Sequence, residues 1–150
     1  MAVEVVPARL VHVGPIASRM RAVDRVEAAA FGNSPRAALR QGLIGGEAWT
    51  ALVDGRPEAM FGVVVGSVLS GECRPWMLGT DEIYRHGREL LRDGPAWVDR
   101  LFDSMPRARN LVSANNMQAI RLLRRWGFTV ENDDVTVGGV MFRTFWKERG

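Results

Sequence analysis

The sequence indicates one small globular domain with a modest positive charge. Its 150 residues are 47% hydrophobic and 25% charged, and the formal net charge is +3. This length and balance favour a single hydrophobic core over residues 1–150 and argue against two domains. Lys147 is the only lysine, so the positive charge comes almost wholly from arginines, which form no continuous run. We therefore expect a solvated basic surface; a nucleic-acid partner is left open but is not indicated.

What the sequence lacks argues against several kinds of site. Cys73 is the only cysteine, so an intramolecular disulfide cannot form. The two histidines, His12 and His86, lie far apart, so we expect no metal site. The N-terminal residues do not resemble a signal peptide, and no apolar run reaches the ~18 residues of a membrane span. We expect a protein without a membrane span that stays in the cytoplasm or in a particle assembled there.

Hydrophobic periodicity predicts the elements of the first half of the chain. In chain order these are a strand at 3–6, a helix at 16–31, a helix at 34–46, and strands at 49–53 and 59–65. The first helix has an apolar stripe formed by Met20, Val23, Val26 and Ala30. Ser34 is the expected N-cap of the second helix, with Pro35 in the first helical position. Gly55 suits the tight turn of a β-hairpin between the two strands.

The second half alternates helices and strands. The expected elements are a loop at 66–75, a strand at 76–78, a helix from Thr80 to an interruption at Asp93-Gly94-Pro95, a helix from Pro95 to Met105, a strand at 109–113, a helix at 116–126, and strands at 128–132 and 140–146. A strand, a helix and a strand in succession imply a parallel crossover, whereas hairpins imply antiparallel neighbours. We expect an α/β domain with a mixed, mostly antiparallel sheet flanked by helices.

The stretch "NNMQAIRLLRRWGF", residues 115–128, carries the clearest motif. Asn115 or Asn116 can cap a helix, and one face of that helix is apolar. Gly127 lies where a left-handed C-terminal cap is expected, and Phe128 returns to the core. These features fit an ordinary capped amphipathic helix as well as a functional one.

The same stretch resembles the C-terminal motif of GCN5-related N-acetyltransferases, the GNAT family. In that motif an Asn opens a helix that contains Ala-Ile and Leu and ends in Gly-Phe, and the matching residues are Asn116, Ala119, Ile120, Leu122, Gly127 and Phe128. The resemblance implies the acyl-CoA N-acyltransferase fold, in which the sheet splays between its fourth and fifth strands and acetyl-CoA lies in the gap. Those strands correspond to 76–78 and 109–113. If acetyl-CoA binds, the resemblance places Leu78, Ser113 and Asn116 at the cofactor.

The loop after the fourth strand departs from the family pattern. The pattern requires Arg or Gln and two or three spaced glycines, because bare amides approach the pyrophosphate at a helix N-terminus. Here "LGTDEIYRHGREL" offers two isolated glycines, Gly79 and Gly87. Asp81 and Glu82 place two carboxylates where phosphate charges would lie. The nearest remnant of the pattern is 85–88.

Proton transfer is the second departure. Many family members carry a Tyr that protonates the departing thiolate, and Leu123, which cannot donate a proton, stands at that position. The only tyrosine, Tyr84, is far away in the sequence. Four carboxylates are candidates for a general base, none favoured over the others and each expected to be an ordinary surface group: Glu47, Glu58, Glu72 and Asp81. An amine would approach from the side of Glu47 and Glu72. The sequence therefore assigns no catalytic residue.

A narrower resemblance fits both departures. The runs "PWMLGTDEIYR", "NLVSANNMQAIRLLRRWGF" and "FRTFWKERG" are similar to phage proteins typified by internal virion protein A of short-tailed coliphages, over residues 49–149. The resemblance implies a phage virion or morphogenesis protein with a degenerate acetyltransferase-like fold, non-catalytic and without a cofactor. Its partners would be other phage virion proteins, in an oligomer or docked on a larger ring, first in the host cytoplasm and then in the virion.

Arginines and a tryptophan mark the expected docking surface, because both residue types are enriched at interaction hot spots. The candidates lie on the 116–126 helix: Arg121, Arg124, Arg125 and Trp126. The sequence leaves three hypotheses open. They are a virion scaffold, an active acetyl-CoA-dependent N-acetyltransferase acting on an unknown amine, and a nucleic-acid packaging protein that uses the three arginines.

Overall fold

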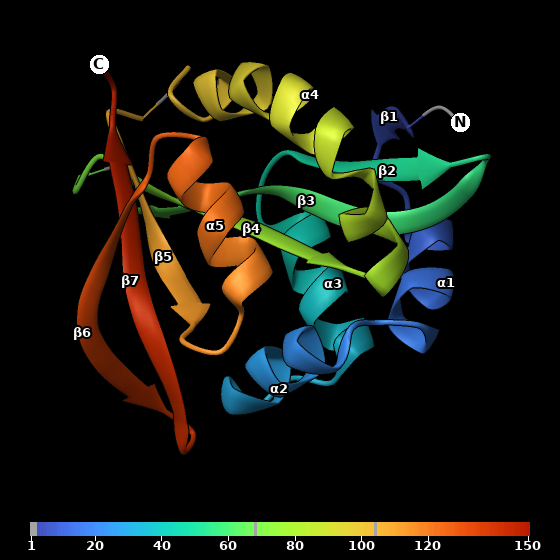
Figure 1. Cartoon of the computed structure of the whole chain (residues 1–150), viewed down its shortest axis with the longest axis horizontal. Coiled ribbons are helices and arrows are strands. Elements are labelled where there is room, and N and C mark those ends of the chain that lie inside the picture. Colours follow the sequence, from blue (N-terminus) through green and yellow to red (C-terminus); the bar gives the residue numbers. More distant parts are fainter. Residues whose placement is uncertain (1–2, 68, 104) are drawn as a thin grey trace.

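A seven-stranded sheet with helices on both faces forms the body of the protein (Figure 1). The computed structural model describes residues 3–67, 69–103 and 105–150. The strands are β1 (Val3–Pro7), β2 (Ala48–Val53), β3 (Arg56–Ser67), β4 (Glu72–Gly79), β5 (Arg107–Ser113), β6 (Thr129–Val137) and β7 (Val140–Glu148). The helices are α1 (Val13–Ser18), α2 (Ala22–Ala30), α3 (Pro35–Ile44), α4 (Gly87–Leu101) and α5 (Met117–Arg125), with 3-10 helices η1 (Leu10–His12) and η2 (Asp81–His86).

The strand order is β1-β2-β3-β4-β5-β7-β6. β4 and β5 run parallel, and all other neighbouring strands run antiparallel. The parallel step requires a crossover connection, which η2 and α4 supply. The predicted fold class, an α/β domain with a mixed and mostly antiparallel sheet, is confirmed.

Two layers of helices bury opposite faces of the sheet. On one face, Val98 of α4 and Ile120 of α5 pack in one cluster with Phe145 of β7. On the other face, Ile16 of α1 and Leu39 of α3 pack with Met60 of β3. The short α2 lies beside α3, near the end of β5 (Figure 1).

The single helix predicted at 16–31 is wrong, because the chain forms α1 and α2 with a break between them. A tertiary contact causes the break. Met20 forms an isolated β-bridge with Thr80. The Arg21 N–H donates to the Gly79 carbonyl oxygen over 2.9 Å. Pairing with the end of β4 therefore overrides the local preference for a continuous helix.

The loop predicted at 66–75 is largely replaced by a hairpin. β3 and β4 continue through most of it, and Val65 pairs with Cys73 across the two strands. Val68, which falls in that stretch, lies outside the described residues. The valine-rich end of β3 favours extended backbone and provides a pairing edge, so β4 is longer than the strand predicted at 76–78.

Thr80 does not cap the helix that follows it. Its hydroxyl donates to Glu58 of β3, 2.5 Å from Oε1, so the side chain is drawn away from the helix terminus. The next residues form η2, a 3-10 helix, and α4 begins only at Gly87.

The predicted interruption at Asp93-Gly94-Pro95 is also wrong, because α4 continues through it. Proline lacks an N–H and pushes away the carbonyl four residues earlier. That carbonyl belongs to Leu91, which is 41% exposed, so water can reach it. The neighbouring Leu90 carbonyl accepts a bond from Trp126 Nε1 of α5 over 3.1 Å. Pro95 and Leu91 are both exposed, so the proline lies on the solvent side of the helix.

Three local predictions are confirmed. Ser34 caps α3 and Asn116 caps α5, each through a side-chain oxygen that accepts an N–H of the first turn. Gly127 follows α5 with a φ of +93°, the left-handed conformation that glycine adopts without strain. At the other end of the crossover, α4 ends at Leu101, earlier than predicted. Ser104, within the predicted helix, lies outside the described residues.

We expect Gly94→Ala to destabilise the protein. A Cβ at Gly94 would lie 2.2 Å from the Trp126 ring, so the indole must move and its bond to Leu90 is lost. Overpacking of this kind costs about 1–3 kcal/mol. The control is Gly87→Ala, at the start of the same helix, where a Cβ meets nothing within 4 Å. Urea unfolding should show the loss for Gly94→Ala alone, and equal free energies of unfolding for both variants would contradict this packing.

Candidate functional site

The sheet opens between β4 and β5. Among the described residues, the two strands pair only near their first residues, Glu72 with Arg107 and Cys73 with Ala108. Beyond these pairs β4 stays bonded to β3 and β5 to β7, so the strands diverge toward their C-terminal ends. The splay expected between the fourth and fifth strands is therefore present, and we call it the β4–β5 gap.

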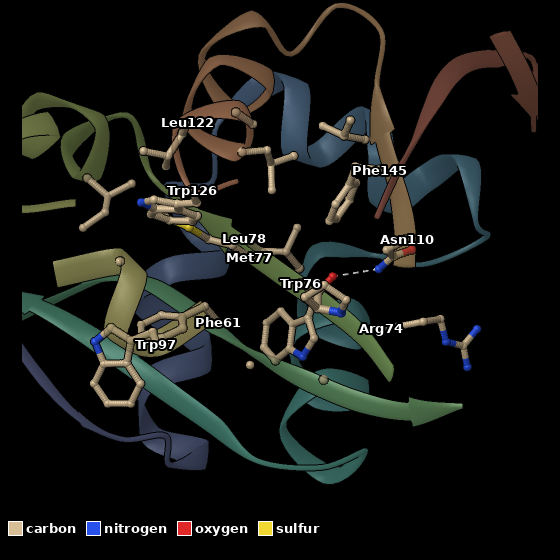
Figure 2. Close-up of a pocket in the computed structure, with 18 of the residues that line it drawn as sticks. Phe61, Arg74, Trp76, Met77, Leu78, Trp97, Asn110, Leu122, Trp126 and Phe145 are labelled. Carbon is tan, nitrogen blue, oxygen red and sulfur yellow. Dashed lines mark hydrogen bonds between the residues drawn. The ribbon is translucent and has the colours of Figure 1, made fainter. Parts of the chain in front are cut away.

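Asn110 spans the narrow end of the gap (Figure 2). Its Nδ2 donates to the Pro75 carbonyl oxygen of β4 over 2.9 Å. Its Oδ1 accepts the Leu111 N–H of β5 over 2.8 Å. One side chain thus satisfies a backbone group on each of the two strands where sheet pairing has ended.

One residue of β4 turns both of its backbone polar groups toward the gap. In an antiparallel ladder, alternate residues turn their backbone groups toward the same side. The Pro75 oxygen points to β5, and the backbone groups of Gly79 bond to Arg21 and to Asp24 of α2. Met77 lies midway between them, so its N–H and C=O face the gap as well. Within the described part of the chain, no hydrogen bond reaches these two groups.

A cavity of about 600 Å³ passes through the gap from one face of the sheet to the other (Figure 2). Phe61 of β3 and Trp97 of α4 line it on one face. Gly42 of α3 and Trp76 of β4 line it on the other. The strands are hydrogen-bonded elsewhere in the sheet, so these two parts join between β4 and β5. The volume is that of a small-molecule site.

Most of the cavity wall is apolar and much of it is aromatic. The rings of Trp49, Phe61 and Trp97 form a triad with centroid separations of 4.8, 5.5 and 5.9 Å. On the other face Trp76 lies against Gly42, where a Cβ would come within 2.3 Å of the ring. The Trp76 Nε1 is buried without a hydrogen-bond partner among the described residues. A bound ligand with an acceptor atom would satisfy this donor.

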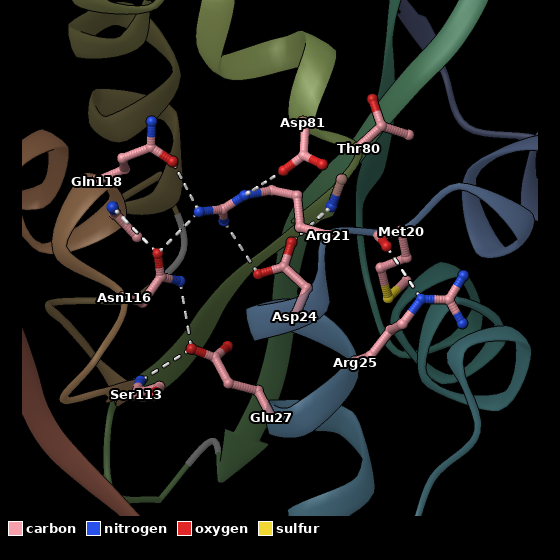
Figure 3. A network of polar contacts seen from close by, with 12 residues as sticks. Met20, Arg21, Asp24, Arg25, Glu27, Thr80, Asp81, Ser113, Asn116 and Gln118 are labelled. Carbon is pink, nitrogen blue, oxygen red and sulfur yellow. Dashed lines mark hydrogen bonds and ion pairs between the residues drawn. The ribbon is translucent and has the colours of Figure 1, made fainter.

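Polar groups of α2 close the wide end of the gap (Figure 3). Asp24 Oδ2 accepts the Gly79 N–H at the end of β4 over 3.0 Å. One turn later, Glu27 Oε1 accepts the Ser113 N–H at the end of β5 over 2.9 Å. The same oxygen accepts a longer bond from Asn116 Nδ2 over 3.3 Å. Consecutive turns of one helix therefore hold the two diverging strand ends.

Arg21, just before α2, joins this cluster to α5. Its guanidinium donates to Gln118 over 3.0 Å, and to Asp24 and Asn116 over 3.2 Å each. It also lies over the Tyr84 ring, 4.1 Å from the centroid, in a cation–π contact. Arg21 is only 5% exposed, so this positive charge is buried between α2, η2 and α5.

Burial raises the pKa of Glu27 from its ordinary value of 4.5 to about 7. The charge of Asp24 adds to the rise, whereas the bonds from Ser113 and Asn116 and the charge of Arg21 oppose it. Both bonds reach Oε1, and Oε2 has no partner among the described residues. A carboxyl that titrates near neutrality and keeps one oxygen free is suited to accept a proton from a ligand.

Two neighbours of Glu27 are also perturbed. Burial raises the pKa of Asp24 to about 6, against the lowering effect of its bond to Gly79. Burial likewise raises the pKa of Tyr84, so its hydroxyl stays protonated. The structure brings this tyrosine, the only one in the sequence, to the wall of the same cavity as Leu123.

The three predicted cofactor residues lie around the gap. Leu78 lines the cavity from β4, and Asn116 lines it from the N-cap of α5. Ser113 is buried at the end of β5, where its N–H bonds to Glu27. The structure brings all three to one place, and their contact with a cofactor stays a prediction.

None of the four predicted carboxylates takes the position of Glu27, although Asp81 reaches the cluster with its Oδ1 3.8 Å from Arg21 Nε. Burial would raise the pKa of Glu58, but bonds from Thr80, Arg19 and Arg56 outweigh it and hold the pKa below its ordinary value. Glu58 is fully buried, so its prediction as a surface group is wrong. Its carboxylate instead accepts hydrogen bonds from these three side chains and so holds β3 against the segments that carry Arg19 and Thr80. The other three lie outside the cavity wall: Glu47, Glu72 and Asp81.

The loop after β4 does not form a phosphate cradle. The Gly79 amide is already bonded to Asp24, and a Cβ at Gly79 would meet the Glu58 carbonyl oxygen at 2.9 Å. Asp81 and Glu82 occupy the first turn of η2. Their charges oppose a diphosphate at this turn, in agreement with the departure seen in the sequence.

The predicted docking residues divide between two environments. Arg121, Arg124 and Arg125 are exposed on α5. Trp126 is half-buried, lies against Gly94 of α4 and lines the cavity. Its ring is therefore engaged inside the protein, whereas docking by the three arginines stays a prediction.

Sequence reasoning missed the α2 cluster. The predicted apolar stripe contains Val26, which is 47% exposed, whereas Asp24 is only 3% exposed. A signal for the cluster is present in the sequence, because Arg21, Asp24 and Glu27 recur at a spacing of three and so share one face of a helix. The periodicity of the apolar residues concealed it.

Two negative findings concern the described residues. They contain no group of three His, Cys, Asp or Glu side chains placed to hold a metal ion. None of their helices combines the length and the apolar character needed to cross a bilayer.

We expect Glu27→Gln to change how stability depends on pH. Between the ordinary pKa of 4.5 and the folded value of about 7, the folded protein binds more protons than the unfolded chain. Stability therefore falls as the pH rises across this window. The amide oxygen can still accept both hydrogen bonds but cannot ionise, so the variant should be about 2 kcal/mol more stable than the parent above the window, and similar below it.

Urea unfolding at a series of pH values measures this difference. The control is Glu89→Gln, which removes another carboxyl from the cavity wall and should leave the profile unchanged. Parallel profiles for the parent and Glu27→Gln would show that Glu27 is not the titrating group.

Comparison with known proteins identifies the fold. No protein-family model and no curated protein sequence matches the chain. Among solved structures, the aminoglycoside acetyltransferase AAC(6′)-Ib in complex with ribostamycin and coenzyme A has a TM-score of 0.69 and 15% identity, covering 99% of this chain and 94% of that chain. The acetyltransferase of the GNAT family from Streptococcus pneumoniae has a TM-score of 0.65 and 12% identity, covering 99% and 100%.

A third similar structure is the ribosomal-protein-S18-alanine N-acetyltransferase from Escherichia coli, with a TM-score of 0.65 and 16% identity, covering 98% of this chain and 94% of that chain. Identities of this size show the fold alone. The similarity extends over nearly the whole chain. The protein therefore has the fold of the GNAT acetyltransferases.

Proposed function

We propose that the protein transfers an acyl group from a thioester of coenzyme A, or of a related pantetheine carrier, to an amine. One observation supports this best. The cavity in the β4–β5 gap has the unpartnered Met77 peptide on one edge and the free Oε2 of Glu27 at its wide end. Acyl transfer needs both groups, because the amine must lose a proton and the carbonyl oxygen must gain a hydrogen-bond donor.

The residues of the cavity account for each step. The Glu27 carboxylate takes a proton from the amine, whose nitrogen bonds to the thioester carbonyl carbon. The Met77 N–H stabilises the charge that develops on the carbonyl oxygen. The C–S bond breaks and the thiolate leaves. Tyr84, which lines the same cavity, is our candidate to protonate the thiolate in place of Leu123, and the proton that Glu27 took from the amine then returns to the Tyr84 oxygen.

The pantetheine part of the donor would lie in the gap, beside Leu78 and Asn116. Its amides can pair with strand-edge groups such as the Met77 C=O and with the buried Trp76 Nε1. The diphosphate of coenzyme A has no equivalent partners, because Asp81 and Glu82 occupy the turn where it would bind. We therefore expect the protein to hold its donor mainly through pantetheine.

A virion scaffold without catalysis is the second candidate, and one observation favours it. The turn after β4 carries the carboxylates of Asp81 and Glu82, and its Gly79 amide is already bonded to Asp24. In this alternative the exposed arginines of α5 would contact other phage virion proteins, in an oligomer or on a larger ring. Binding of a thioester distinguishes the two candidates.

We expect acetyl-CoA to bind, and acetyl-pantetheine, which lacks the diphosphate, to bind within roughly fivefold of it, because exposed charges add little affinity. Calorimetric titration measures both. Asn116→Ala should weaken both ligands alike, since it removes a group of the gap and a helix cap. The matched control is Asn115→Ala, at the exposed neighbouring position. A folded protein that binds neither thioester would reject acyl transfer and favour the scaffold.

We expect Glu27→Gln to lower the rate of acyl transfer by about 10²–10⁴-fold. Release of thiol from acetyl-CoA, measured with a panel of primary amines, reports the rate. For the parent, the rate should rise with pH through about 7, as Glu27 loses its proton. Glu89→Gln removes a carboxyl from the same cavity and should keep the parental rate. An unchanged rate in Glu27→Gln would assign the base to another group.

A further inference from the structure

Part of the cavity extends beyond the gap, beneath α4. Its wall there contains Val5 of β1, Ala51 of β2 and Met77 of β4, and the contacting rings of Phe61 and Trp97, 5.5 Å apart between centroids, close one side of it. We call this part the α4 chamber. Three strand spacings of ~4.8 Å separate β1 from β4, so the residues that line the chamber span on the order of 14 Å. The two carbons of an acetyl group lie about 1.5 Å apart, so acetyl transfer leaves most of the chamber unused.

The wall of the α4 chamber is apolar but not closed. Val5, Phe61, Met77 and Trp97 are only half-buried, although they line the space between a helix and a sheet. Side chains in a close-packed core would be fully covered there. The guanidinium of Arg100 lies over the Trp97 ring, 5.7 Å from its centroid, and shields this aromatic edge. The chamber is therefore a preformed apolar space.

The chamber and the gap are two parts of one continuous cavity, and Met77 lines the place where they join. The strand residues that line the chamber offer hydrocarbon, aromatic and thioether surface, so a chain without charge fits it. A chain attached to a thioester carbonyl in the gap would enter the chamber directly. A strongly hydrated acyl group would lose its water against these strand side chains without gaining a hydrogen bond from them.

We propose that the acyl donor carries an unbranched apolar chain on the order of eight to ten carbons, and that this chain lies in the α4 chamber. The inference rests on the proposed acyl transfer and specifies the group transferred. The chamber length sets the upper limit of the chain. The apolar wall supplies affinity that increases with each methylene buried.

Two neighbouring valines of β1 provide a matched test. Val5 lines the chamber, whereas the side chain of Val6 points to the opposite face of the sheet and is not part of the cavity wall. Both are half-buried on the same edge strand, so Val5→Phe and Val6→Phe impose similar strain on folding. Only Val5→Phe places a ring inside the chamber. Thermal unfolding of both variants checks that each is folded.

Titration with octanoyl-pantetheine and acetyl-pantetheine tests the chamber. The parent and Val6→Phe should bind the octanoyl ester at least roughly tenfold more tightly than the acetyl ester, because six more carbons are buried. Val5→Phe should bind the two esters alike while keeping the parental affinity for the acetyl ester. Equal affinities of both esters for the parent, or the same loss in both variants, would overturn the inference and leave the proposed acyl transfer intact.

Free octanoate separates the chamber from the proposed reaction. If neither thioester binds, the proposed acyl transfer is rejected. In that case, octanoate binding that Val5→Phe abolishes and Val6→Phe retains would still support an apolar-chain site in the α4 chamber. Absence of octanoate binding to the folded parent would overturn that site as well.

Discussion

The hydrogen bonds from α2 to the ends of β4 and β5 hold the open sheet together. Two strands that diverge in a protein interior leave backbone groups unpaired, at a cost of about 1–3 kcal/mol for each buried group. Asp24 and Glu27 accept the N–H groups of Gly79 and Ser113, one on each strand. Asn110 bridges the narrow end, and the N–H and C=O of Met77 are left facing the gap.

The same bonds determine the chemistry of the gap. The carboxyls of Asp24 and Glu27 have one buried guanidinium between them, that of Arg21, which also pairs with the exposed Asp81, so their charges are not fully balanced. Burial then favours a proton on one of the two near neutral pH. A residue needed to close the sheet is therefore also a group that exchanges protons with whatever occupies the cavity. Structure and reactivity depend here on one helix face.

Local signals in the sequence predict much of this fold and the position of part of the site. The caps at Ser34 and Asn116 and the glycine turn at Gly127 depend on neighbouring residues alone, and all three are present. The α1–α2 break and the β3–β4 hairpin depend on pairing between distant segments, so periodicity missed them.

The site divides in the same way between what a motif can show and what only the folded chain shows. Asn116 belongs to a motif and was predicted at the gap. The role of Met77 comes from its position in β4, where backbone groups alternate in direction along the strand. This direction does not depend on the side chain. Glu27 becomes distinctive only when α2 brings it to the end of β5. Part of the function in this fold thus depends on backbone groups and on the burial of side chains, and neither can be recognised from the residue types alone.

Two tryptophan–glycine contacts flank the cavity, Trp76 on Gly42 of α3 and Trp126 on Gly94 of α4. Neither contact belongs to the hydrogen-bonded ladder of the sheet. The tryptophan ring that packs on each glycine therefore sets the distance between that helix and the gap, and this ring can be substituted. A paired exchange, a smaller ring with a larger residue in place of the glycine, would resize the cavity from the helix side. Proteins with this architecture can thus acquire a different ligand size without rebuilding the scaffold that holds the strands.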